Sequence, residues 1–237
     1  MEALGDVSRA TVVEIGPGRG ALTGLLAERA QRLIAIELDR ILSAQLRMKY
    51  AARSDVEIVE GDVLQVDLAA LIGRGRKARV VGNLPYYITS PILEHLFRFS
   101  GHIEGMVLLV QREVAERIAA RPGSRDYGLL SVVTQLHARV EVLFTLPPGA
   151  FSPPPKVHST ALRLTPFEQE LAVPRDGFVE FLKLSFAQKR KTLANNLKPR
   201  YGEAAVRTAL AAAGLRADVR AEAVPLEKAA AVFRSLA

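Results

Sequence analysis

The chain has 237 residues, a net charge of +7, 49% hydrophobic residues and no cysteine. The apolar content allows a substantial core and excludes a disordered chain. The lack of cysteine excludes disulfides, thiolate metal sites and a cysteine nucleophile, and it fits a reducing cytosol. The positive charge, carried mostly by arginine, is compatible with a nucleic-acid partner.

Local patterns exclude further classes of protein. The four histidines stand in no metal-ligand spacing, and no apolar run approaches the length of a membrane span. The first ten residues lack the apolar stretch of a signal peptide. We therefore expect a cytoplasmic monomer with no metal and no membrane partner.

Short apolar runs alternate with helical patterns in the first half of the chain. The predicted strands are Thr11–Ile15, Leu33–Glu37, Val56–Glu60, Arg79–Gly82 and Gly105–Val110, and the first predicted helices are Ala21–Ala30 and Arg40–Tyr50. This alternation indicates an α/β fold in which helices cover both faces of a parallel sheet.

The pattern changes after Leu129. A helix over Leu129–His137 leads to two alternating segments, Arg139–Phe144 and Ser159–Leu164, which predict an antiparallel hairpin at one edge of the sheet. Beyond a boundary near Thr165–Phe167 we expect only short helices, at Asp176–Gln188, Ala204–Ala213 and Leu226–Leu236. The expected domains are 1–167 and a small, basic, all-helical domain over 168–237.

A glycine-rich turn, EIGPGRG at residues 14–20, joins the first strand to the first helix. Gly16 and Gly18 allow the backbone to turn sharply and to approach a ligand closely. Glu37 ends the second strand, where a carboxylate can accept both hydroxyls of a ribose. This pair of features fits a nicotinamide enzyme and a methyltransferase alike.

Two further motifs favour the methyltransferase. Asp62 and Val63 follow the third strand, where the carboxylate can accept the exocyclic amine of an adenine while the valine packs on the ring. The tetrapeptide NLPY, residues 83–86, follows the fourth strand, at the edge where open α/β sheets bind ligands.

The NLPY sequence suits methylation of adenine N6, a poor nucleophile whose lone pair is delocalised into the ring. The Asn83 side-chain oxygen and the Leu84 carbonyl could accept the two amine hydrogens and so expose that lone pair. Pro85 fixes the turn, and Tyr86 offers a face on which the base can stack.

These motifs, with four later segments, resemble the small-subunit (16S) rRNA adenine N6-dimethyltransferases, the KsgA family. The segments that carry the resemblance are NLPYYITSPIL (83–93), VQREVAERI (110–118), DYGLLS (126–131), PPGAFSPPPKVHSTALRL (147–164) and FAQKRKTLANNL (186–197). The resemblance implies a class I, Rossmann-like methyltransferase that binds S-adenosyl-L-methionine. It further implies dimethylation of two adjacent adenosines near the 3′ end of small-subunit rRNA, on a ribosomal precursor particle.

The resemblance also assigns roles to residues. The implied cofactor contacts fall on Gly16, Gly18, Glu37, Asp62, Val63 and Asn83. The implied contacts to the target adenine fall on Asn83, Leu84, Pro85 and Tyr86, with Phe151 closing on the other face of the base. Two aromatic faces would replace the stacking that a flipped nucleotide loses.

One family motif has no match before Thr11. In the family, a Gly-Gln-Asn-Phe-Leu segment ahead of the first strand covers the cofactor and shapes the target pocket. We therefore expect this chain to fold but to hold S-adenosylmethionine loosely, because a cover that excludes water strengthens the polar contacts beneath it.

A basic stretch from Phe181 to Gly202 contains no acidic residue. In the context of an rRNA methyltransferase we expect its cations to contact RNA phosphates. The expected RNA-binding residues are Lys183, Lys189, Arg190, Lys191, Lys198 and Arg200, joined by Arg112 on a helix after the fifth strand.

Three alternative functions remain open at this point. A related enzyme could methylate large-subunit rRNA and confer antibiotic resistance. A non-catalytic ribosome assembly factor could keep the same fold. A nicotinamide oxidoreductase could share the glycine turn, although NLPY disfavours it.

Overall fold

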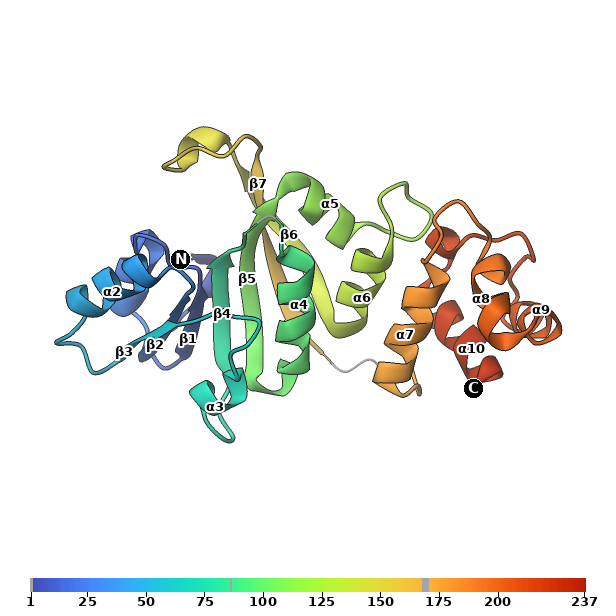
Figure 1. Ribbon diagram of the computed structural model, residues 1–237, viewed down its shortest axis with the longest axis horizontal. Coiled ribbons are helices and arrows are strands. Elements are labelled where there is room, and N and C mark those ends of the chain that lie inside the picture. The colour runs from blue at the N-terminus through green and yellow to red at the C-terminus, as the bar shows by residue number, and fades with distance from the viewer. Residues whose placement is uncertain (1, 86, 168–170) are drawn as a thin grey trace. The chain divides into compact units, whose positions relative to one another are not determined.

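A computed structural model describes residues 2–85, 87–167 and 171–237 (Figure 1). The chain forms two compact units. The first contains Met1–Ala115 and Ala138–Phe167, and the second contains Glu116–His137 and Glu168–Ala237.

The first unit is built on a seven-stranded sheet with strand order β3-β2-β1-β4-β5-β7-β6 (Figure 1). Neighbouring strands among β1 to β5 pair in parallel, whereas β7 pairs antiparallel with both β5 and β6. The predicted α/β fold with an antiparallel edge hairpin is therefore confirmed. The strands are β1 (Thr11–Ile15), β2 (Arg32–Glu37), β3 (Val56–Glu60), β4 (Ala78–Asn83), β5 (Ile103–Gln111), β6 (Ala138–Leu146) and β7 (Ser159–Pro166).

Helices and short 3-10 turns connect these strands. Val12 of β1 and Leu33 of β2 are buried in one cluster with Leu26 and Leu46, which come from the first two helices. Apolar burial therefore packs those helices onto one face of the sheet. The elements are η1 (Glu2–Leu4), α1 (Ala21–Ala27), α2 (Arg40–Lys49), α3 (Leu68–Ile72), α4 (Thr89–Arg98), η2 (Ser100–His102), α5 (Arg112–Ala119) and η3 (Pro148–Ala150).

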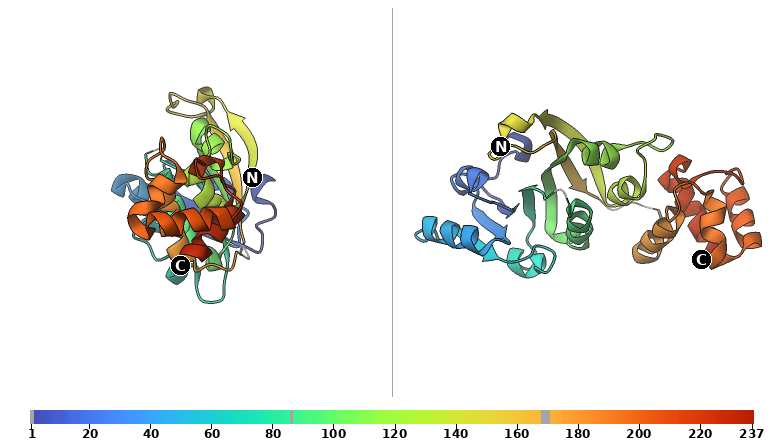
Figure 2. Two further views of the ribbon diagram at one scale, coloured as in Figure 1. Left: turned by 90° about the vertical axis from the view of Figure 1, so that its right-hand side faces the viewer. Right: turned by 45° about the horizontal axis from the view of Figure 1, so that its top comes forward.

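The second unit is helical. Its core includes a cluster of the Phe178, Phe181 and Phe233 rings, whose centroids lie 5.4–5.9 Å apart. Helix α9 ends at Ala212, two residues before Gly214, whose φ is +64°, and α10 begins directly after Pro225. The helices are α6 (Leu129–His137), α7 (Arg175–Ser185), α8 (Leu193–Tyr201), α9 (Glu203–Ala212) and α10 (Leu226–Leu236), with η4 (Ala221–Ala223). The left-hand view of Figure 2 looks toward these helices.

Helix α8 is absent from the sequence prediction. Pro199 lies inside it, which argues against a helix when the sequence is read alone. The helix begins because the Thr192 side chain accepts the backbone N–H of Asn195 at 3.2 Å. It is held in place because Leu193 and Leu197 are buried in the core of the second unit.

The division of the chain differs from the expected domains in one respect. One connection between the units falls at Phe167, where the sequence places the boundary, but Glu116–His137 also belongs to the second unit. Its helix α6 contributes Val132 and Leu136 to the core that contains Phe178. Residues Glu116–His137 belong to the second unit because the apolar face of α6 is buried there. The local sequence pattern does not show which unit buries that face.

Gly82 of β4 illustrates how closely the central strands approach. A Cβ atom on Gly82 would lie 2.8 Å from the Ile15 carbonyl oxygen and 3.1 Å from the Ile15 Cβ. We therefore expect Gly82→Ala to destabilise the first unit by about 2 kcal/mol through overpacking. Urea-induced unfolding followed by circular dichroism measures the change.

Gly105→Ala is the matched control for this prediction. Gly105 also lies in a strand, β5, but the nearest atom to its added Cβ would be 3.9 Å away. We expect this variant to be neutral or slightly more stable. Equal stability of the two variants would contradict the argument from close approach.

Candidate active site

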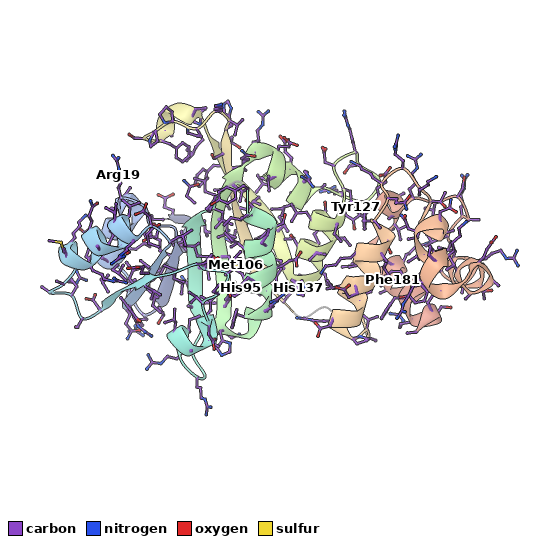
Figure 3. All side chains as sticks on the ribbon, in the orientation of Figure 1. Arg19, His95, Met106, Tyr127, His137 and Phe181 are labelled. Carbon is purple, nitrogen blue, oxygen red and sulfur yellow. The ribbon has the colours of Figure 1, made fainter. Side chains whose placement is uncertain are left out.

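The candidate site lies at the carboxyl ends of the parallel strands, where β1, β2, β3 and β4 each run into a loop. Between β1 and α1 the backbone turns through Gly16 and Gly18, with φ angles of +66° and +59°. Residues with a Cβ rarely adopt these angles. The Arg19 side chain extends outward from this turn (Figure 3), so the turn presents mainly backbone toward the site.

Glu37, predicted to bind a ribose, braces this turn. Its Oε2 accepts the Gly18 N–H at 2.8 Å, and its Oε1 accepts the Asp39 N–H at 2.9 Å. The side chain is buried, and each carboxylate oxygen has more than one acceptor position. Glu37 can therefore hold the turn and still accept a ligand hydroxyl.

Asp62 and Val63 form the next wall of the site. The Asp62 Oδ1 accepts the Leu64 N–H at 2.9 Å, while Val63 is buried. The Gly61 N–H donates to the Glu37 backbone carbonyl at 2.9 Å, which joins the loop after β3 to the end of β2. The structure thus brings the predicted ribose and adenine residues together.

Asn83 is the last residue of β4, and its side chain is exposed. The turn that follows is anchored, because the Leu84 N–H donates to the Leu109 carbonyl at 3.0 Å and the Leu84 side chain is buried. The Pro85 carbonyl accepts the Ile88 N–H at 3.2 Å, which leads the chain into α4. Tyr86, the predicted stacking residue, lies outside the described residues.

The glycine turn and the Asn83 turn are neighbours. A Cβ added to Gly16 would lie 3.7 Å from the Asn83 carbonyl oxygen. The predicted cofactor turn therefore lies directly beside the predicted target-base turn, which is the juxtaposition that a transfer between two bound groups needs.

Phe151, the predicted second aromatic face, lies in the loop between β6 and β7. Ser159, the first residue of β7, pairs with Gln111, the last residue of β5. The loop therefore leaves the sheet at the same edge as Asn83, and both figures show it extending beyond that edge (Figures 1 and 2). Phe151 itself is half-buried.

Glu14 is a residue of the site to which the sequence analysis assigns no role. It is 2% exposed, and its Oε2 has no hydrogen-bond partner among the described residues. Burial raises the pKa of Glu14 to about 7; the Glu37 charge adds to this, and the Thr23 hydroxyl opposes it. An acid inside the apolar strand TVVEI is the signal that could have identified it.

The predicted RNA-binding cations divide between the two units. Arg112 is exposed at the start of α5 in the first unit, and the others are in the second unit. Lys183 pairs with Glu180 at 3.1 Å. The exposed cations are Lys189, Arg190 and Lys191 in the loop between α7 and α8, and Lys198 and Arg200 in the last turn of α8.

Within residues 2–85, 87–167 and 171–237, no three His, Cys, Asp or Glu residues are grouped so that they could hold a metal ion. No helix in the same ranges is long and apolar enough to cross a membrane.

The buried carboxyl of Glu14 predicts a specific dependence of stability on pH. Its pKa is higher in the folded chain, so its contribution is fully present below pH 4.5, falls as the pH rises toward 7, and is lost above 7. We expect Glu14→Gln to remove this loss and to stabilise the chain at pH 8 by up to about 3 kcal/mol.

Thermal unfolding of both proteins from pH 4.5 to 8 measures the difference. Glu94→Gln, which neutralises an exposed carboxyl on α4, is the control and should leave the pH profile unchanged. A Glu14→Gln profile parallel to that of the parent would show that the Glu14 carboxyl is ionised in the folded chain.

The chain is similar in sequence to known rRNA methyltransferases. A family model described as "Ribosomal RNA adenine dimethylase" matches residues 7–237. The curated protein "Ribosomal RNA small subunit methyltransferase A" of Koribacter versatilis is 55% identical, covering 100% of this chain and 88% of its own length. The protein of the same name from Acidobacterium capsulatum is 60% identical, and the similarity covers 100% of this chain and 84% of that protein.

Two solved structures share the fold along nearly the whole chain. A dimethyladenosine transferase from Plasmodium falciparum has a TM-score of 0.79 at 23% identity, covering 98% of this chain and 91% of its own. The 23S rRNA methyltransferase ErmE has a TM-score of 0.72 at 28% identity, and the match covers 99% of this chain and 94% of the ErmE chain.

Proposed function

The chain belongs to the ribosomal RNA adenine dimethylase family, and we propose that it dimethylates N6 of two adjacent adenosines near the 3′ end of small-subunit rRNA. One observation carries the proposal beyond family membership. The turn that begins at Asn83 lies beside the glycine turn at Gly16, so a methyl donor and a target base can meet between them.

The residues of the first unit fit S-adenosyl-L-methionine as the donor. This cofactor would supply a methyl group bound to a positively charged sulfonium, which is activated because its leaving group is a neutral thioether. We assign the ribose hydroxyls to Glu37, the adenine amine to Asp62 and the adenine ring to Val63. The positive-φ turn at Gly16 and Gly18 leaves room for close approach of the ligand.

The residues of the Asn83 turn have the task of orienting the target amine. The exposed Asn83 side chain can accept one N6 hydrogen, and the Leu84 carbonyl can accept the other. Burial of the Leu84 side chain and the hydrogen bond to Leu109 hold that carbonyl in a fixed position. We assign stacking of the base to Tyr86 and Phe151. Catalysis is then mainly alignment, with no covalent enzyme intermediate.

The small-subunit substrate is supported over the large-subunit alternative by the degree of similarity. The two relatives named for the small subunit are 55% and 60% identical, whereas ErmE, named for 23S rRNA, is 28% identical. Transfer of tritiated methyl groups to unmethylated small ribosomal subunits, with large subunits in parallel, tests the proposal. Labelling of large subunits alone would overturn it, and labelling of neither would favour an assembly factor.

Asn83 offers a direct test of amine orientation. We expect Asn83→Ala to lower the methyl-transfer rate by about 10²–10³, as for loss of one preorganised polar group. RNA affinity should change little, because phosphate contacts dominate it. Single-turnover transfer to small subunits measures the rate, and Gln45→Ala, which removes an exposed amide on α2, is the control. Near-normal transfer by Asn83→Ala would contradict the assigned role.

The basic loop between α7 and α8 offers a test of RNA binding. We propose that Lys189, Arg190 and Lys191 contact phosphates, and we expect the triple alanine variant to bind rRNA more weakly. The slope of log affinity against log salt concentration should become shallower by about 2. Filter binding of small-subunit rRNA over a range of salt concentrations gives the slope.

The matched control removes the same charge elsewhere. Arg74, Arg76 and Lys77 are three exposed cations in the loop between α3 and β4 of the first unit. Their triple alanine variant should keep the parental slope. If the slope of log affinity against log salt concentration becomes shallower by the same amount in both variants, net charge and not a defined contact governs RNA binding.

A further inference from the structure

A small cavity is lined only by residues of the second unit, none of which belongs to the proposed methyl-transfer site. It has a volume of about 140 Å³ and is bounded by residues of α5, α6, α7, α8 and η4, and by the loops before α6 and α8. An apolar cavity of about 150 Å³ can hold one benzene ring. The cavity is therefore the size of a single six-membered aromatic ring.

The walls of the cavity suit a flat ring. Tyr127 and Phe186 both line it, with ring centroids 6.2 Å apart in an edge-to-face arrangement. Figure 3 labels Tyr127 in the second unit. Aromatic side chains are the usual surfaces on which unpaired RNA bases stack.

Asn196 supplies an unsatisfied acceptor in the same wall. The side chain is 9% exposed, and its amide nitrogen donates to the backbone carbonyls of Ser185 at 2.6 Å and Gln188 at 3.3 Å. Its Oδ1 has no hydrogen-bond partner among the residues that the structure describes. A buried acceptor without a donor is costly, so a ligand that brings an N–H group would be favoured.

Charged side chains also line the cavity. Three carry a positive charge and two a negative charge: Arg117, Lys189, Lys191, Asp126 and Glu222. The excess of one positive charge matches the single negative charge of one phosphodiester. Because Lys189 and Lys191 are exposed, they can reach a phosphate while the attached base enters the cavity.

We propose that this cavity binds one unpaired pyrimidine nucleotide of the rRNA. An N–H group of the base, the N4 amine of cytosine or the N3–H of uracil, donates to the Asn196 Oδ1. The ring lies against Phe186, and the phosphate lies at Lys189 and Lys191. This proposal rests on the proposed function, since it specifies how the second unit recognises RNA. Contacts to the base can distinguish one nucleotide from another, whereas phosphate contacts alone carry no sequence information.

Binding of mononucleotides to the unmodified protein is the first test. Cytidine 5′-monophosphate is compared with uridine and adenosine 5′-monophosphates and with ribose 5-phosphate, by NMR titration in excess S-adenosylhomocysteine to occupy the cofactor site. We expect cytidine monophosphate to bind about tenfold or more tightly than ribose 5-phosphate, the difference expected for one stacked base. Equal affinities, or the tightest binding for adenosine monophosphate, would overturn the proposal.

Filling the cavity is the second test. Gly128 lines the cavity, its φ is not in the left-handed region, and a Cβ there would meet no atom within 4 Å. Gly128→Leu should weaken binding of cytidine monophosphate about tenfold or more, with Gly128→Ala intermediate. Gly101→Leu in η2 is the matched control, since its added Cβ would also meet no atom within 4 Å, and should bind normally.

The outcomes separate this inference from the proposed function. Thermal unfolding shows whether each variant is folded. If Gly128→Leu does not fold, the binding of cytidine monophosphate by Gly128→Ala decides the test. Normal binding by a folded Gly128→Leu protein would overturn the cavity site. Methyl transfer to small subunits by the parent is scored independently, because binding of a mononucleotide requires no turnover.

Discussion

The buried carboxylate of Glu37 is the interaction on which the rest of the candidate site depends. Its two oxygens hold the N–H groups of Gly18 and Asp39, and its backbone carbonyl holds the N–H of Gly61. One residue therefore joins the loops that follow β1, β2 and β3. A carboxylate is suited to this position because a buried charge must be satisfied by hydrogen bonds, and loop N–H groups need an acceptor.

Two residues close to this edge of the sheet have unusual surroundings. Glu14 is buried with one oxygen unsatisfied, close enough to Glu37 for the two charges to interact. Gly82 allows β4 to approach β1 more closely than any side chain permits. Unsatisfied buried groups and unusually close backbone contacts are more frequent at functional sites than elsewhere in proteins.

The second unit holds a group of exposed cations on a stable helical core. Its core is formed by Phe178, Phe181 and Phe233 with the apolar faces of five helices. The Asn196 amide holds the carbonyls of Ser185 and Gln188 and so fixes the start of the basic loop. The loop cations remain exposed because the aromatic core, and not the loop, supplies the stability.

The sequence by itself determined most of the sheet and the place of each motif on it. Short runs rich in β-branched residues and bounded by turn residues located β1 and β3 to the residue. The central strand β1 is buried along its whole length, whereas β3, at the edge of the sheet, is only partly buried and contains two glutamates. The positions of Gly16, Glu37, Asp62 and Asn83 at strand ends indicated where a candidate site would lie, because the carboxyl ends of parallel strands meet at one edge.

Only the tertiary structure decided the features that rest on contacts between distant residues. Helix α8 forms despite Pro199 because Thr192 caps it and the core buries one face. Residues Glu116–His137 belong to the second unit because α6 packs against α7, far along the chain. The unsatisfied oxygens of Glu14 and Asn196 could not be foreseen either, since hydrogen-bond satisfaction depends on which groups folding brings within reach.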